Sequence, residues 1–189
     1  SQLRLSLLGS YLSPDFVTQG RNLILYGRSG RGKTHLAVAV AYRAIQNGFE
    51  ALFTTAAALI DELSQASREG RFGDVLHRYA RVHVLVIDEL GYLTYGPDAA
   101  NVLFHVVNER HLALKPIVIT TNKPLAAWGN ALHDPDLAEA IVDRILEQND
   151  LEKNNIVESL ISEGYNPREI IDAFAWIKDF SSNIHQNMR

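Results

Sequence analysis

Short apolar runs and longer amphipathic segments take turns along most of this 189-residue chain. The apolar runs are rich in Val, Ile and Leu, which is typical of buried strands, and they cover 22–26, 51–54, 82–87 and 117–121. Apolar residues in the other segments recur at helical spacing, which predicts helices over 33–47, 56–63, 73–80, 98–111 and 135–148. Strands that alternate with helices predict an α/β fold with a mainly parallel sheet flanked by helices.

Capping residues mark two of the helix ends. Gly48 follows the first predicted helix and is suited to its C-terminal cap. Asp134 is suited to the N-terminal cap of the helix over 135–148, whose Leu137, Ile141 and Ile145 lie on one face.

The same pattern divides the chain into a lead-in over 1–20, a core over 21–149 and a tail over 150–189. The tail begins with a short predicted helix over 155–162. A second helix follows, with Asn166 as its N-cap and Pro167 at its first position. Its apolar face carries Ile170, Ile171, Phe174 and Ile177. We therefore expect a C-terminal α-helical extension, a small helical hairpin.

Composition narrows the class of protein. The chain has no Cys, which fits a reducing cytoplasm and excludes disulfides, thiolate metal sites and Cys nucleophiles. It lacks an apolar run long enough to cross a bilayer, and no secretory signal is visible, so we expect a cytoplasmic protein. Its seven His do not form a metal-binding pair, and a formal net charge of −4 gives no overall basic surface for nucleic acid.

The segment Gly27–Thr34 reads G-x-x-x-x-G-K-T, the sequence of a phosphate-binding P-loop. A predicted strand precedes it and a predicted helix follows, which is the context that the motif requires and that a Gly/Lys surface turn would lack. The nucleotide-binding residues that we predict are Gly27, Arg28, Ser29, Gly30, Arg31, Gly32, Lys33, Thr34 and His35.

The residue types in this loop explain its chemistry. Glycines let backbone N–H groups approach phosphate oxygens closely, next to the positive end of a helix. Lys33 supplies a positive charge for the β- and γ-phosphates of ATP, and the Thr34 hydroxyl is placed for Mg²⁺. Arg28 and Arg31 are less usual here; they either face solvent or contact a neighbouring subunit or DNA.

The strand over 82–87 is followed by Asp88 and Glu89, the pattern of a Walker B motif. Ligands of open α/β sheets bind outside the carboxyl ends of the strands, where these acids would lie. We predict that Asp88 binds Mg²⁺ and that Glu89 activates the water that attacks the γ-phosphate. The alternative is a pair of solvated acids that end a strand. Because the second acid suits a general base, hydrolysis is favoured over simple binding and over a small-molecule kinase.

Two further polar residues are candidates for the same site. Asn122 follows the strand over 117–121 and could contact the γ-phosphate or the attacking water, or could simply begin the turn before Pro124. Arg144 is a candidate arginine finger, which would enter a neighbouring subunit's site, and Arg110 is the competing candidate.

Together these motifs resemble the IstB-type ATP-binding proteins of bacterial insertion sequences, relatives of the DnaC helicase loaders in the AAA+ superfamily. The segments that carry the resemblance are VLVIDELGYLTY (84–95), AANVLFHVVNERH (99–111), IVITTNKPL (117–125), AIVDRI (140–145) and the P-loop. The resemblance implies a helper of DNA transposition that binds ATP, assembles in several copies on DNA and acts with a transposase. It also implies that Lys33, Thr34, Asp88, Glu89, Asn122 and Arg144 have the roles given above.

The chain departs from the family pattern at both ends, so we expect a form shortened at each end. Only about twenty residues precede the P-loop strand, and after Leu146 the family's further strand and G-x-S-x-R ending are replaced by the helical tail. We favour a junction made by truncation or fusion over an unrelated natural extension. A DnaC-like helicase loader and an inactive nucleotide-binding remnant remain alternative functions.

Overall fold

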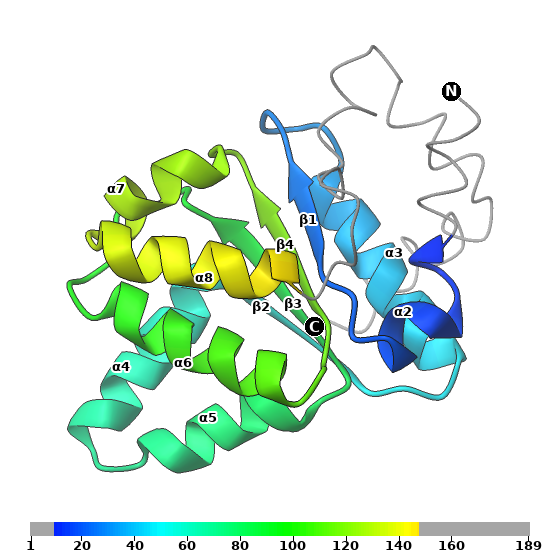
Figure 1. Cartoon of the computed structure of the whole chain (residues 1–189), viewed down its shortest axis with the longest axis horizontal. Coiled ribbons are helices and arrows are strands. Elements are labelled where there is room, and N and C mark those ends of the chain that lie inside the picture. The colour runs from blue at the N-terminus through cyan, green and yellow to red at the C-terminus, as the bar shows by residue number, and fades with distance from the viewer. Residues whose placement is uncertain (1–9, 148–189) are drawn as a thin grey trace, which may run out of the picture.

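The computed structural model describes residues 10–147, so the predicted tail lies outside the described residues. Its centre is a parallel sheet of four strands, shown in Figure 1: β1 (Leu23–Tyr26), β2 (Ala51–Thr55), β3 (Val84–Leu90) and β4 (Ile117–Thr121). The strand order is β1-β4-β3-β2. Strand β4 therefore lies between the strand that leads into the P-loop and the strand that carries the acid pair.

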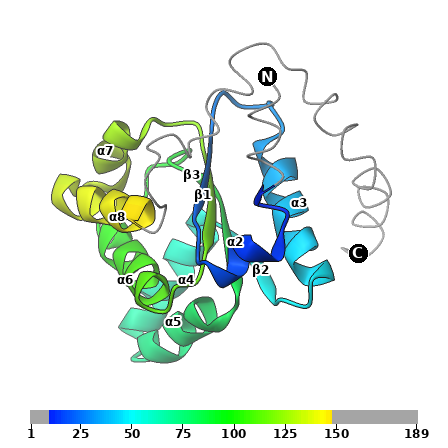
Figure 2. The same ribbon diagram turned by 45° about the vertical axis from the view of Figure 1, so that its right-hand side comes forward.

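Helices cover both faces of this sheet, which confirms the predicted fold class. They are α2 (Pro14–Thr18), α3 (Lys33–Gln46), α4 (Ala56–Arg68), α5 (Phe72–Arg81), α6 (Ala99–Leu112), α7 (Trp128–Leu132) and α8 (Pro135–Glu147), with a 3₁₀ turn at Leu125–Ala127. Figure 2 shows α3 on one side of the sheet and α6 to α8 on the other. No helix among residues 10–147 is long and apolar enough to cross a membrane.

The alternation of side chains along the strands produces two hydrophobic cores. Leu23, Leu25 and Val86 point to one face and are buried with residues of α2 and α3. Ile24 and Ile87 point to the other face and are buried with residues of α4, α6 and α8. Because successive strand residues face opposite sides, a strand covered by helices on both faces is apolar throughout.

Part of the expected lead-in contributes to the first of these cores. Tyr11 and Phe16 are 2% and 1% exposed, and their rings meet edge to face with centroids 5.4 Å apart. The Arg21 guanidinium lies 5.5 Å from the centroid of the Tyr11 ring. These residues therefore belong to the folded unit, and they were not recognised as core residues from the sequence.

Three other elements differ from the prediction. Helix α4 continues through the polar stretch after residue 63, because Ala66 keeps its buried face in register. Strand β3 begins two residues later than predicted, at Val84, and extends through Asp88 and Glu89 to Leu90. Helix α7 was not predicted, since five residues are too few to show a periodic pattern.

Two buried polar side chains join elements at the amino end of the sheet. The amide nitrogen of Asn22 donates to the carbonyl of Ile145 at 3.0 Å, and its oxygen accepts from the N–H of Ile117 at 2.8 Å. Arg110 is 0% exposed and donates to the carbonyls of Tyr79, Ala80, Val82, His83 and Pro116. Burial lowers the pKa of the Arg110 guanidinium to about 9, which still leaves it protonated at neutral pH. This end of the sheet is therefore held together by contacts between side chains and backbone.

Candidate active site

The P-loop joins the carboxyl end of β1 to the first turn of α3. Gly30 and Gly32 have φ of 76° and 81°, the left-handed region that glycine adopts without strain. Gly32 is the residue that caps α3, and the N–H of Gly27 donates to the carbonyl of Thr121 at 3.2 Å. An added Cβ at Gly27 or Gly30 would meet no atom within 4 Å, so there is open space beside the loop. The loop thus has room for phosphate groups at a helix N-terminus.

Lys33 lies in the first turn of α3 and is 4% exposed. Its ammonium donates to the carbonyls of Gly27 at 2.8 Å and Arg28 at 3.0 Å, and it lies 5.7 Å from the centroid of the Tyr92 ring. The ammonium is therefore held within the loop by neutral carbonyls. Phosphate oxygens are stronger acceptors for an ammonium group because the hydrogen bond is charge-assisted.

The next residue connects the P-loop to the acid strand. The Thr34 hydroxyl lies 3.0 Å and 3.1 Å from the two carboxylate oxygens of Asp88, which is 4% exposed. The structure therefore brings together the two residues that the sequence predicts as magnesium ligands, from segments 54 positions apart. A hydroxyl and a carboxylate are oxygen ligands of the kind that Mg²⁺ prefers.

The two acids lie on an irregularity in β3. Ile87 pairs with Ile119 and Leu90 with Thr121, so β3 takes three residue steps where β4 takes two. This is a β-bulge, which adds one residue to one strand and re-aims its side chains. Glu89 has φ of 61° and is exposed, whereas Asp88 is buried. A positive φ is uncommon for a residue other than glycine, and such residues cluster at functional sites.

Hydroxyl groups of β4 and of the loop after β3 contact residues in and beside this bulge. Thr120 donates to Asp88 Oδ1 and accepts from the N–H of Glu89 at 2.9 Å. Thr121 donates to the carbonyl of Leu90 at 2.7 Å. The Tyr95 hydroxyl accepts from the N–H of Gly91 at 3.0 Å and lies 3.3 Å from the carbonyl of Glu89. Sequence reasoning missed Thr120; the available signal was a polar residue inside an otherwise apolar strand.

Asn122 directly follows β4, at the same end of the sheet. Its amide oxygen is buried and has no hydrogen-bond partner within residues 10–147. A buried acceptor without a partner is costly unless a ligand or water satisfies it. An amide oxygen can accept from a water molecule, and the Thr34 and Asp88 oxygens with the open space beside the P-loop fit a nucleotide with its magnesium ion.

A family model described as IstB-like ATP binding protein matches residues 3–158. The chain belongs to this family. The match confirms the resemblance seen in the sequence, and it begins earlier and ends later than the segments that carried that resemblance.

Two curated relatives of this IstB-like chain are insertion-sequence proteins. It is 36% identical over 158 residues to the insertion sequence IS5376 putative ATP-binding protein of Geobacillus stearothermophilus, which covers 84% of this chain and 60% of the relative. It is 39% identical over 131 residues to the IS21 putative ATP-binding protein of Pseudomonas aeruginosa, which covers 69% of this chain and 49% of the relative. The chain thus spans about half to three fifths of the length of these relatives.

Solved structures extend the likeness to replication proteins. The DnaC helicase loader superposes with a TM-score of 0.67 and 27% identity, over 79% of this chain and 87% of that one. AMPPCP-bound DnaA from Aquifex aeolicus superposes with a TM-score of 0.63 over 94% of this chain and 61% of that one. At 19% identity, this likeness shows a common fold and no more.

The arginine candidates of the IstB-like chain lie in different environments. Arg28, Ser29 and Arg31 are exposed on the P-loop, and His35 is exposed in the first turn of α3. Arg144 is half-buried on α8, where its Nε donates to Asn108 Oδ1 at 2.9 Å and its guanidinium lies 4.5 Å from the Phe104 ring centroid. Arg110, in contrast, is fully buried and bonded to backbone carbonyls, so its guanidinium is not available to a neighbouring subunit.

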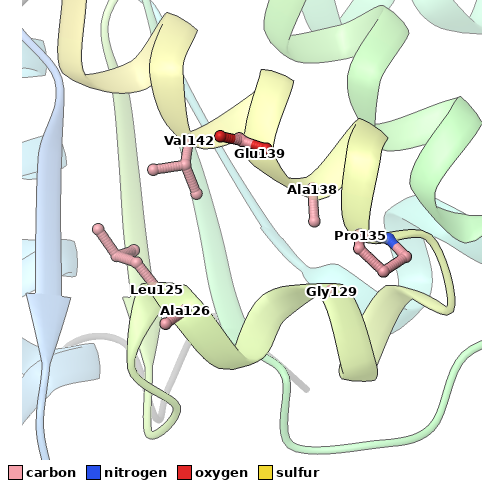
Figure 3. A pocket seen from close by; sticks show the side chains of 7 residues that line it. All are labelled: Leu125, Ala126, Gly129, Pro135, Ala138, Glu139 and Val142. Carbon is pink, nitrogen blue, oxygen red and sulfur yellow. The ribbon is translucent and has the colours of Figure 1, made fainter.

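A separate hollow of about 320 Å³ lies between α8 and the segment that contains the 3₁₀ turn and α7. Figure 3 shows its lining residues, Leu125, Ala126, Gly129, Pro135, Ala138, Glu139 and Val142. None of the residues predicted to bind nucleotide lines it. The candidate active site therefore consists of the P-loop and the acid pair, Asp88 and Glu89, on β3.

Proposed function

We propose that this chain binds ATP with Mg²⁺, hydrolyses the γ-phosphate and acts as a helper of DNA transposition. One observation carries the ATPase proposal: the Thr34 hydroxyl contacts the Asp88 carboxylate, beside an exposed Glu89. The amide oxygen of Asn122, which has no hydrogen-bond partner within the described residues 10–147, lies at the same end of the sheet. A nucleotide-binding switch would need the first contact only. The additional acid and amide favour a reaction in which water is the acceptor.

Each residue has a role that its position supports. The P-loop and the adjoining His35 would surround the phosphates, and Lys33 would exchange the Gly27 and Arg28 carbonyls for phosphate oxygens. Thr34 and Asp88 would hold Mg²⁺, which neutralises phosphate charge when bound.

The remaining two residues would act on the attacking water. Glu89 would accept its proton, and the amide of Asn122 would orient it or contact the γ-phosphate. The exposed carboxylate of Glu89 suits this role, because a general base must be accessible to the water that it deprotonates.

We further propose that Arg144 acts in a neighbouring subunit's site, which would make ATP part of a subunit interface. Its partial exposure on α8 supports this role over one for Arg110. The guanidinium would have to leave Asn108 to reach another subunit. Mixing the inactive variants Lys33→Ala and Arg144→Ala tests the proposal, since one composite site would regain both residues. Mixtures with no more ATPase activity than either variant alone would exclude a role in trans.

The transposition role is supported by relatives whose names place them in insertion sequences. We expect ATP-dependent assembly on DNA and contact with a transposase. Sedimentation of the chain with duplex DNA, with and without a non-hydrolysable ATP analogue, tests assembly. The expected result is a larger complex only with analogue and DNA, and only for the wild-type chain, not for Lys33→Ala. An unchanged monomer in every condition would instead support an inactive remnant.

The likeness to the DnaC helicase loader supports a second candidate function, helicase loading, because it covers most of that chain at 27% identity. The ATPase residues are common to both functions and cannot separate them. Binding assays with an IS21-family transposase and with a bacterial replicative helicase do so. ATP-dependent binding to the helicase alone would favour the loader.

A further inference from the structure

A single buried hydroxyl contacts both acids of the candidate active site. Thr120 is 1% exposed and lies on β4, next to the bulged part of β3. Its oxygen accepts the N–H of Glu89 at 2.9 Å, and its proton is donated to Asp88 Oδ1. A hydroxyl has one proton, which Thr120 donates to Asp88. A lone pair of the same oxygen therefore accepts the backbone N–H of Glu89.

These two contacts act on different properties of the site. The bond to Asp88 fixes the carboxylate that also contacts Thr34. The bond from Glu89 fixes a backbone N–H at a residue with φ of 61°, a conformation that a glutamate adopts only where its surroundings hold it. Without the hydroxyl this N–H would lack its partner, and the bulge could relax toward a regular strand with Glu89 aimed elsewhere.

We propose that Thr120 is a positioning residue that holds Glu89 in the bulged conformation required for water activation. The proposal rests on the proposed function, in which Glu89 is the general base. It adds that the direction of the Glu89 side chain is set from the neighbouring strand and not by the Walker B segment alone. Thr120 itself need not touch ATP or water for this effect.

Thr120→Val tests the proposal, because it removes the hydroxyl and preserves the volume and branching of the side chain. We expect kcat for ATP hydrolysis to fall about 10- to 100-fold, since a misaligned base loses much of its catalytic effect. The affinity for an ATP analogue measured without Mg²⁺ should change by less than about threefold, because the P-loop is untouched and the contact of Thr120 with the proposed magnesium ligand Asp88 then has no part in binding. Thr120→Ser keeps the hydroxyl and should restore most of the lost kcat.

Thr121→Val is the matched control. It removes an equally buried hydroxyl from the next residue of β4, one that contacts Leu90 and Lys123 and neither acid. We expect it to lower stability about as much as Thr120→Val while its kcat stays within about threefold of wild type. Equal loss of kcat in both valine variants, or no loss in Thr120→Val, would overturn the proposal.

Amide hydrogen exchange gives a readout that does not depend on hydrolysis. The Glu89 amide should exchange at least about tenfold faster in Thr120→Val than in the wild-type, Thr120→Ser or Thr121→Val chains, since its acceptor is gone. If the wild-type chain fails to hydrolyse ATP, the proposed function fails, and the exchange rates still decide whether Thr120 holds the bulge. An unchanged Glu89 exchange rate in Thr120→Val would overturn the positioning role.

Discussion

The two ends of the sheet both contain buried polar side chains, but the partners of these side chains differ. At the amino end, Arg110 and Asn22 bond to backbone carbonyls and to a backbone N–H. At the carboxyl end, Asp88 bonds to the hydroxyls of two threonines, and the Asn122 oxygen has no partner among the described residues. The exposed Glu89 next to Asp88 has a positive φ.

This difference shows how a buried polar residue can be assigned a role. A group bonded to backbone atoms of several separate elements, such as Arg110 or Asn22, holds those elements together, and removing it leaves those atoms unsatisfied. Lys33 differs because its two carbonyl partners belong to its own loop. A group that bonds to other polar side chains, or retains an unused acceptor, can bind a ligand by exchanging partners. Arg110 was a candidate for catalysis from the sequence, and its backbone partners make it a structural residue instead.

Replacing Arg110 should give the largest effect, on stability. Arg110→Met preserves much of the side-chain volume and leaves five carbonyls at the amino end without their donor. We expect the free energy of unfolding to fall by about 3–5 kcal/mol, measured by denaturant titration. Arg110→Lys, which has fewer donors, should lose less than Arg110→Met. If the free energy of unfolding of Arg110→Met falls by less than about 1 kcal/mol, the structural role of Arg110 is contradicted.

Lys33→Ala should give the next largest effect, on nucleotide binding. It removes the charged donor of the P-loop, and we expect affinity for an ATP analogue to fall on the order of 100-fold, or about 2.7 kcal/mol. Isothermal titration calorimetry measures this change. Arg28→Ala is the control, because Arg28 is exposed on the same loop and should lower affinity far less. Comparable losses in both variants would mean that the loop binds nucleotide through its overall charge.

Asn22→Ala tests the amino end with an uncharged residue. It removes a donor to Ile145 and an acceptor for the N–H of Ile117, both buried. We expect the free energy of unfolding to fall by about 2 kcal/mol, because both backbone groups lose their hydrogen-bond partner. Nucleotide affinity of the folded protein should stay the same. A large change in affinity without a change in stability would reverse the assignment of this end.

Asn122→Ala is the matched variant at the carboxyl end and should have the smallest effect on stability. Its amide oxygen has no hydrogen bond to lose within residues 10–147, so we expect a change within about 0.5 kcal/mol. ATP hydrolysis should nevertheless fall, by about 10- to 100-fold, if the amide orients water or phosphate. Thermal unfolding and phosphate release measure the two quantities. If Asn122→Ala destabilises the protein as much as Asn22→Ala does, the proposed difference between the two ends of the sheet is contradicted.

Local patterns in the sequence were sufficient for much of this site. The P-loop, the apolar strands and the Asp134 cap each depend on neighbouring residues, and the cap is confirmed by a 2.9 Å bond from the N–H of Leu137 to Asp134 Oδ1.

The rest depends on residues that are distant in the sequence. The bulge in β3 becomes visible only against the register of β4, and the contacts of Thr120 with both acids follow from that pairing. The burial of Arg110 likewise depends on the ends of α5, β3 and β4 meeting around it. Neither arrangement leaves a periodic or motif signal in its own segment.

The central claim is that the carboxyl end of the sheet hydrolyses ATP through Glu89. The most direct test compares single-turnover phosphate release by the wild-type chain and Glu89→Gln in the presence of Mg²⁺, with analogue binding measured alongside. We predict that Glu89→Gln binds the analogue within about threefold of wild type and releases phosphate at least about 100-fold more slowly, since only the general base is lost. Phosphate release by Glu89→Gln at the wild-type rate would contradict the claim.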